Sequence, residues 1–247
     1  MRHLVTTTIS VLLFAIASSN PGKAYAQDAF PVTDWSFVGW DAVNASIGEE
    51  IVAPDRQRLR TTSKPKVQST ISAPNFSYRF SSARSRTNLA NFVAKTRRTD
   101  PQFAAQLEKL FASTDFMGKV DSELQRVGLR FDDLSHCYAV WWVSAWKASK
   151  GDPIEATNQT YAAVTKQAHD GFVRSGAFNN ANEAQKQELA QALLIQTALL
   201  DASVKANAKN PTMMAALSKA AISGAKASGL RIDKMVLTPT GFSQIPD

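Results

Sequence analysis

The chain has 247 residues, of which 44% are hydrophobic and 20% are charged, and its formal net charge is +7. This composition agrees with a folded globular protein, and the length allows one or two domains. The single cysteine, Cys137, excludes an intramolecular disulfide, and the chain is long enough to bury a core without one.

The first 26 residues are predicted to be a secretory signal peptide. Arg2 and His3 precede an apolar run from Leu4 to Ala17, and Ala24-Tyr25-Ala26 predicts cleavage after Ala26. An uncleaved anchor is the competing interpretation, but the run is shorter than the ~20 residues that a bilayer requires. We therefore expect an exported protein, periplasmic or secreted, with no membrane span after cleavage.

Residues 27–74 are predicted to form an aromatic segment followed by a flexible linker. The stretch from Phe30 to Val43 contains Trp35 and Trp40 and is too apolar to remain free, so we expect it to lie against the folded body. From Pro54 to Pro74 the chain is basic and polar. Such a sequence cannot bury enough apolar surface to offset the entropy lost on ordering.

Apolar residues at helical spacing begin at Ser81 and predict an all-α domain over residues 75–247. Short connections between the periodic segments indicate a single bundle of about seven helices. Six of them are expected near residues 81–98, 101–111, 116–127, 154–175, 182–204 and 211–225. The tail from Leu230 to Asp247 is predicted to be extended, with Met235-Val236-Leu237 packed back on the bundle.

The remaining helix, from Asp132 to Gly151, is predicted to be the centre of the bundle. Asp132 or Asp133 can cap its start, Gly151 can adopt the left-handed conformation at its end, and Pro153 prevents continuation.

Apolar residues cover almost the whole circumference of this helix, as expected for a buried helix. The narrow polar seam that remains contains His136, Ser144 and Lys147, and Ser149 is expected near the exposed end. The structural core is predicted to be built on four aromatic residues, Tyr138, Trp141, Trp142 and Trp146.

Four short stretches of the chain resemble an uncharacterised family of exported bacterial proteins, a domain of unknown function. They are Phe76-Ser77-Tyr78, Leu89-Ala90-Asn91-Phe92, Tyr138-Ala139-Val140-Trp141-Trp142 with Ala145-Trp146, and Leu237-Thr238-Pro239-Thr240-Gly241-Phe242. The tryptophan motif is the most specific, and the resemblance covers roughly Pro74 to Phe242. It implies a bacterial, exported, mostly helical domain and implies no activity.

The residues themselves predict no catalytic site, no metal site and no cofactor. The two histidines of the mature chain, His136 and His169, fall in different helices, whereas a metal site needs about three convergent ligands. Asp132, Asp133 and His136 share one helical turn, and a capped helix start is preferred over a ligand cluster. For Cys137, burial as a small hydrophobic residue is preferred over a reactive thiol.

Nucleophile and carboxylate motifs are equally absent from the sequence. It contains no Gly-x-Ser-x-Gly elbow and no phosphate-binding glycine loop. Asp115, Asp121 and Glu123 are close in sequence. Asp121 and Glu123, however, are two positions apart on a helix, and side chains at that spacing do not face each other. We interpret them as solvated surface charges.

Positive charge is concentrated between Asp55 and Arg98, where eleven basic residues accompany Asp55 as the one acid. The predicted anion-binding residues are Arg56, Arg58, Arg60, Lys64, Lys66, Arg79, Arg84 and Arg86. In the cell envelope the available anions are lipid head groups, lipopolysaccharide phosphates and acidic polymers. Nucleic acid is not expected as a partner, because the chain is exported and lacks an aromatic stacking pattern. A solvated linker without a ligand is the alternative.

The sequence therefore favours a non-catalytic envelope protein that binds anionic components through its basic segment. The alternative is an envelope enzyme of the hydrolase type whose site cannot be recognised from sequence. Two buried acids, or an acid and a histidine, that converge in a cleft would favour the enzyme, and a basic face would favour the binding protein.

Overall fold

The computed structural model describes residues 75–151, 156–227 and 229–245. In these ranges the chain forms seven α-helices, a short 3-10 helix and a β-hairpin, and so confirms the predicted all-α architecture. The helices are α5 (Ser82–Thr99), α6 (Pro101–Ser113), α7 (Phe116–Arg126), α8 (Leu134–Lys150), α9 (Asn158–Ser175), α10 (Glu183–Asn207) and α11 (Pro211–Ala227). They are followed by η2 (Ile232–Lys234), β1 (Met235–Thr238) and β2 (Gly241–Gln244).

Several sequence predictions fall outside the described residues. These are the signal peptide at 1–26, the aromatic segment and linker up to Pro74, and Pro153 and Ile154 before the fifth helix.

Polar side chains and glycines set the helix ends, largely as the sequence predicts. Asp100 Oδ1 accepts a hydrogen bond from Phe103 N (2.9 Å), with Pro101 at the first position of α6. Asp133, rather than Asp132, caps α8. Gly151 ends α8 in the left-handed conformation, with φ of 63°, which glycine adopts without steric cost.

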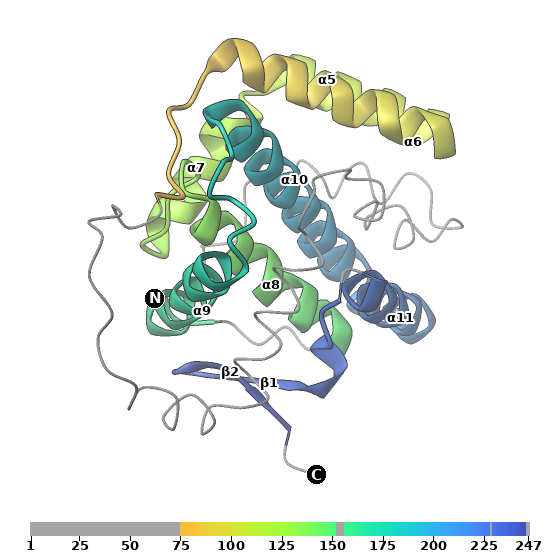
Figure 1. Cartoon of the computed structure of the whole chain (residues 1–247). Helices are drawn as coiled ribbons and strands as arrows, with labels where there is room; N and C mark the ends of the chain where they lie inside the picture. The colour runs from red at the N-terminus through yellow and green to blue at the C-terminus, as the bar shows by residue number, and fades with distance from the viewer. Residues whose placement is uncertain (1–74, 152–155, 228, 246–247) are drawn as a thin grey trace, which may run out of the picture.

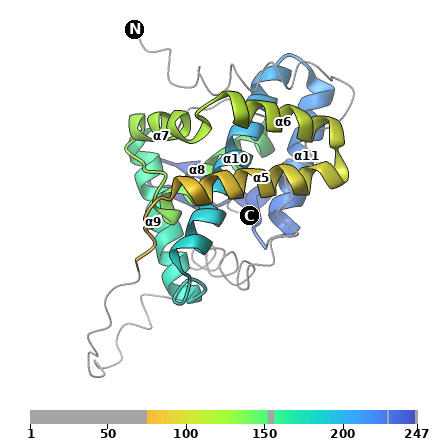
Figure 2. The same cartoon turned by 90° about the horizontal axis from the view of Figure 1, so that it is seen from above.

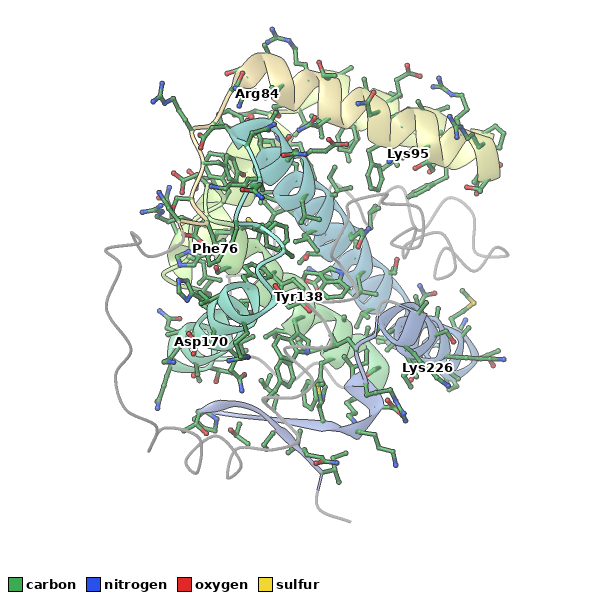
Figure 3. The ribbon with its side chains drawn as sticks, in the orientation of Figure 1. Phe76, Arg84, Lys95, Tyr138, Asp170 and Lys226 are labelled. Atoms are coloured by element: carbon green, nitrogen blue, oxygen red, sulfur yellow. The ribbon has the colours of Figure 1, made fainter. Side chains whose placement is uncertain are left out.

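Helix α8 lies in the middle of the domain and packs against α9, α10 and α11 (Figure 1). Viewed from above, α5 and α6 run side by side across the bundle (Figure 2). Tyr138, Trp141 and Trp142 are fully buried, and Trp146 is 5% exposed. Figure 3 shows Tyr138 in the interior of the domain. All four aromatic residues expected in the core therefore lie there.

Two serines of α8 are more buried than the sequence pattern suggests. Ser144, expected in a polar seam, is 3% exposed, and Ser149, expected near an exposed end, is 7% exposed. Ser149 Oγ donates to Trp146 O (2.6 Å), and Ser149 O accepts from Ser218 Oγ of α11 (2.5 Å). Helix α11 thus covers the end of α8, a contact that the periodicity of α8 alone does not reveal.

The segment before α5 is fixed to α8 by main-chain hydrogen bonds and one aromatic side chain. Leu134 N donates to Phe76 O (3.1 Å), and Tyr78 N donates to Asp132 O (2.9 Å). The ring of Phe76 contacts the rings of His169 and Phe172 edge to face, with centroids 5.1 Å and 5.2 Å away.

The C-terminal tail is an antiparallel hairpin that packs on α8, in agreement with the extended tail predicted. Phe242 stacks on Trp142, with ring centroids 4.3 Å apart and an interplanar angle of 23°. Trp146 Nε1 donates to Met235 O (2.9 Å), which fixes the opposite strand of the hairpin. Met235 is buried, whereas Val236 on the other face is exposed.

A glutamine of α9 covers the outer edge of β2. Gln167 Nε2 donates to Phe242 O (2.8 Å), and Phe242 N donates to Gln167 Oε1 (2.9 Å). The side-chain amide thus pairs with this residue as a neighbouring strand would. Gly241 permits the approach, because its φ is 105° and a Cβ there would lie 2.5 Å from Gln167 Oε1.

We predict that Trp141→Ala lowers the free energy of unfolding by ~3–5 kcal/mol, the usual cost of removing a buried tryptophan. This is a large part of the ~5–15 kcal/mol that stabilises a typical domain. Chemical denaturation measures the loss. Lys109→Ala, on the exposed side of α6, is the control and should change little. Equal stability of the two variants would show that α8 is not the organising helix.

Candidate functional site

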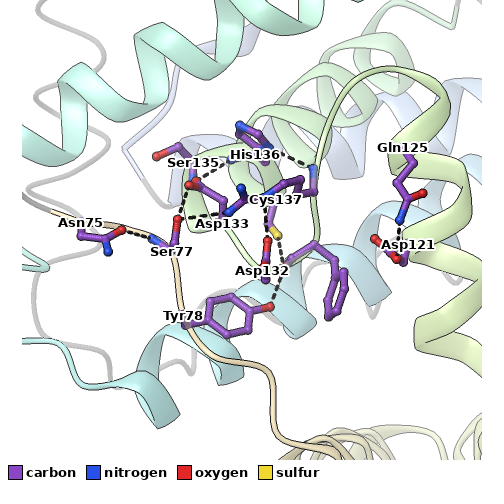
Figure 4. Close-up of polar contacts among 12 residues, drawn as sticks. Asn75, Ser77, Tyr78, Asp121, Gln125, Asp132, Asp133, Ser135, His136 and Cys137 are labelled. Carbon is purple, nitrogen blue, oxygen red and sulfur yellow. Dashed lines mark hydrogen bonds and ion pairs between the residues drawn. The ribbon is translucent and has the colours of Figure 1, made fainter.

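The start of α8 brings together polar side chains from two distant segments of the chain (Figure 4). We name Ser77, Arg130, Asp132, Asp133 and His136 the α8-start cluster. Ser77 Oγ donates to Asp133 Oδ2 (2.9 Å), and Asp133 Oδ1 accepts from the backbone N of Ser135 (2.9 Å) and of His136 (3.4 Å). Arg130 Nε donates to Asp132 Oδ1 (2.9 Å).

The geometry of the α8-start cluster is that of a helix cap and not of a nucleophile. Arg130 N donates to His136 Nδ1 (2.9 Å), and the hydroxyl of Ser77 is directed at Asp133 instead of the histidine. Burial lowers the pKa of His136, so its ring is neutral at pH 7. Both oxygens of Asp133 are occupied by structural hydrogen bonds. The cluster therefore holds residues 75–78 against α8.

A second group of polar side chains lies between α8 and α10, where Asp201 faces Ser144 and Lys147. Burial raises the pKa of the Asp201 carboxyl, while the charge of Lys147 and a hydrogen bond from Ser144 oppose the shift. A hydroxyl, an amine and a carboxyl thus meet at this contact. The sequence did not indicate it, because Ser144 and Lys147 were expected in a seam of α8 with no assigned partner.

The three acids of α7 and its cap that the sequence analysis singled out, and the second histidine, have local partners. Asp115 Oδ1 caps α7 by accepting from Gly118 N (3.0 Å). Asp121 Oδ2 accepts from Gln125 Nε2 (2.7 Å), as Figure 4 shows. Glu123 pairs with Arg126 (2.8 Å). His169 lies beside Asp170 on α9, 3.5 Å from its carboxylate.

Cys137 is fully buried and donates to Phe131 O (3.2 Å). Burial raises the pKa of its thiol well above the usual value, which disfavours the reactive thiolate. In the described part of the chain, no group of three or more His, Cys, Asp and Glu side chains is placed to hold a metal ion. Among the same residues, no helix combines the length and the apolar character needed to cross a bilayer.

Three of the eight predicted anion-binding residues are described, and they lie together at the beginning of α5. Arg79 is exposed, and its backbone N donates to the carboxylate of Glu183. Arg84 Nη1 lies 3.5 Å from Gln187 Oε1, and Arg86 is exposed. The other five, Arg56, Arg58, Arg60, Lys64 and Lys66, lie outside the described residues.

A polar stripe on α10 positions α5, and sequence reasoning missed it. Gln187 accepts from Ser81 N (3.0 Å) and donates to Ser81 O (2.9 Å). Gln191 donates to Ser85 Oγ (2.6 Å) and accepts from Asn88 Nδ2 (2.6 Å). The spacing of Gln187 and Gln191, four residues apart and therefore on one face of α10, was the available signal.

A small cavity continues this polar contact between α5 and α10. Its lining includes Asn91, Lys95, Glu188 and Gln191, and it has room for about one water molecule. It is too small for an organic substrate, so its polar lining serves the contact between the helices.

We predict that Asp201→Asn melts at a higher temperature than wild type and that the difference grows as the pH rises above about 4. Because the folded-state pKa exceeds the ordinary 3.8, the folded protein holds a proton that the unfolded chain releases, and the stability of the wild-type protein falls as the pH rises from 3.8 towards the folded-state pKa. Calorimetry across the range measures the difference. Asp121→Asn, at the surface of α7, is the matched control. Lower stability of Asp201→Asn at neutral pH would show that attraction to Lys147 outweighs the cost of burial.

Comparisons with known proteins place the chain in a family but identify no activity. A family model described as a family of unknown function (DUF6683) matches residues 46–244. The match includes every described helix and begins inside the segment at 27–74 that the sequence analysis separated from the helical domain. No curated protein and no solved structure matches the chain. The protein therefore belongs to DUF6683, a family of unknown function.

Proposed function

We propose that this is an exported, non-catalytic protein of the bacterial cell envelope that binds anionic, phosphate-bearing lipid surfaces. The contact is made by α5 and the basic segment that precedes it. The observation that carries the proposal is the charge of α5, which contains five basic residues and no acidic one. They are Arg84, Arg86, Lys95, Arg97 and Arg98.

The burial pattern of α5 directs part of this charge to solvent. Its buried residues, Ser85, Phe92, Val93 and Thr96, form one stripe that faces the bundle. The exposed stripe runs through Arg86, Ala90, Ala94, Arg97 and Arg98. Small alanines between the arginines allow a flat anionic surface to approach the helix closely.

Part of this charge is not neutralised within the described part of the chain. Arg97 pairs with Glu108 of α6 (2.7 Å). Arg86 and Arg98 form no ion pair with a described residue. An external anion would supply the missing compensation, and five further cations lie between Arg56 and Lys66 in the sequence. The basic segment lies within the residues that the family model matches, which supports treating it and α5 as one unit.

The expected strength follows from membrane electrostatics. Each cation near an anionic surface contributes about 1 kcal/mol, and the attraction is screened beyond a Debye length of ~8 Å at physiological salt. The signal peptide predicted at 1–26 and the positive charge of the mature chain support a location where lipid phosphates are accessible.

We predict that the mature protein is retained on vesicles containing anionic phospholipid at ~50 mM salt and is released as salt increases. A variant with Gln at Arg56, Arg58, Arg60, Lys64, Lys66, Arg86 and Arg98, called the α5 variant, should bind at least about tenfold more weakly. Its melting temperature should not fall, because none of the described positions changed is buried. Co-sedimentation with vesicles measures binding.

The control variant tests whether removal of cations elsewhere on the domain also weakens binding. Lys109→Gln, Lys119→Gln, Arg126→Gln and Lys166→Gln remove cations from α6, α7 and α9. This variant should retain most of the binding. Failure of the wild-type protein to bind anionic vesicles at low salt would leave the basic segment a solvated linker.

Export has a separate test. Mass spectrometry of protein from the extracytoplasmic fraction should find a mature chain that begins at Gln27. Protein with an intact Met1 in the cytoplasmic fraction would overturn the proposed location, and with it the lipid surface of the envelope as the partner.

A further inference from the structure

Residues 76–78 dock on residues 130–133, in the loop that joins α7 to α8, and we call these two segments the latch (Figure 4). Tyr78 donates to the loop twice, through its backbone N to Asp132 O (2.9 Å) and through its hydroxyl to Phe131 O. The hydroxyl of Ser77 donates to the side chain of the next loop residue (2.9 Å). Three successive loop residues thus supply the acceptors, so the docking of residues 76–78 depends on the conformation of the loop.

His136 of α8 fixes the conformation of the same loop. Its Nδ1 accepts a hydrogen bond from Arg130 N (2.9 Å). An imidazole nitrogen that accepts a hydrogen bond carries no proton, so the neutral ring has its proton on Nε2. A second proton can enter only at Nδ1, the atom to which Arg130 donates. Protonation of His136 therefore breaks this hydrogen bond, because two N–H groups cannot bond to each other.

Charged groups around the ring set the pH at which it takes up this proton. Burial has the largest effect and disfavours the charged ring, as does the charge of Arg130. The carboxylates of Asp133 and Asp132 favour the charged ring but do not outweigh burial, and the pKa of His136 lies below its ordinary 6.5. The closed latch therefore keeps the ring neutral at a pH where a histidine exposed to water is already charged.

The remaining ionisable groups near the latch come from its own residues and from three helices. Burial raises the pKa of the Tyr78 phenol and of the Cys137 thiol, so both stay protonated as the pH falls. Lys186 of α10 donates to the carbonyl oxygen of Ser77 (3.4 Å). His169 of α9 contacts the phenylalanine ring of the latch edge to face, with centroids 5.1 Å apart. An experiment on the latch must therefore separate His136 from His169.

We propose that the latch is an acid-sensitive switch, in which protonation of His136 at Nδ1 frees the loop 130–133 and releases residues 76–78 from α8. The switch goes beyond the proposed function and requires neither lipid binding nor export. Its direction follows from proton linkage. The released histidine binds a proton at its ordinary pKa of 6.5 and the closed latch binds it only at lower pH, so the closed form loses stability as the pH falls below 6.5.

The test is amide hydrogen exchange followed by NMR from about pH 7.5 to about pH 5, expressed as protection factors so that the intrinsic pH dependence of exchange is removed. The amides of Arg130, Tyr78 and Leu134 donate the hydrogen bonds of the latch and of its contact with α8. Their protection in the wild-type protein should fall several-fold across this range. The amide of Phe242, which donates to Gln167 Oε1 in the hairpin, is the internal control and should keep its protection.

Two variants assign the effect to one histidine. In His136→Asn the side-chain oxygen takes the place of Nδ1 and accepts from Arg130 N at every pH, so protection of the latch amides should no longer depend on pH. His169→Asn should keep the pH dependence of the wild-type protein. Loss of the dependence in His169→Asn, or its persistence in His136→Asn, would overturn the assignment to His136.

A measurement on the wild-type protein keeps the proposal testable if a variant does not fold. The ¹⁵N chemical shift of His136 Nδ1 distinguishes a nitrogen that carries a proton from one that does not. It should change over the same pH range as the protection of the Tyr78 amide. Protonation of Nδ1 with unchanged protection of the latch amides would show that the histidine titrates without opening the latch, and the switch would be rejected.

Discussion

The packing of aromatic side chains around α8 is the constraint on which the rest of the structure depends. Tyr138 contacts Phe172 of α9 (5.5 Å), and Trp142 stacks on Phe242 of β2 (4.3 Å). Phe76, which precedes α5, contacts Phe172 in turn (5.2 Å). Each aromatic pair contributes about 0.5–1.5 kcal/mol beyond the burial of its area. Three segments far apart in the sequence are thus fixed by one helix, and a change in α8 would displace all three.

Two glutamines attach the ends of the described chain to this core in the same manner. Gln187 of α10 pairs with both backbone polar groups of Ser81, and Gln167 of α9 pairs with both backbone polar groups of Phe242. The oxygen and one N–H of a primary amide lie on the same side of its plane, so together they can pair with the N–H and C=O of one residue at a main-chain edge that no strand covers. These contacts set the register of the segment before α5 and of the hairpin.

The distribution of charge follows from this arrangement. Because α8 is surrounded, the outer helices present their second faces to solvent, and α5 and α11 carry cations there. The α8-start cluster and Asp201 show the opposite pattern, since their acids are used in hydrogen bonds or meet a lysine of the same domain. The acids of these two groups therefore serve the fold, while exposed basic side chains of α5 and α11 remain available to a partner.

The sequence by itself determined the helices, most of their ends and the identity of the central one. These features follow from local chemistry: apolar spacing defines each helix, Asp100 and Asp133 cap the helices that follow them, and Gly151 ends α8. The sequence also revealed the basic run around α5, because its cations are neighbours along the chain.

Only the tertiary structure decided which faces meet. It buried Ser144 and Ser149, brought Asp201 to Lys147, and placed Gln167 on the edge of β2. A helical pattern fixes the direction of a side chain around its own axis, but not the neighbour that it meets. The neighbour depends on how the helices are ordered in space, and that order is set by the packing of the core as a whole.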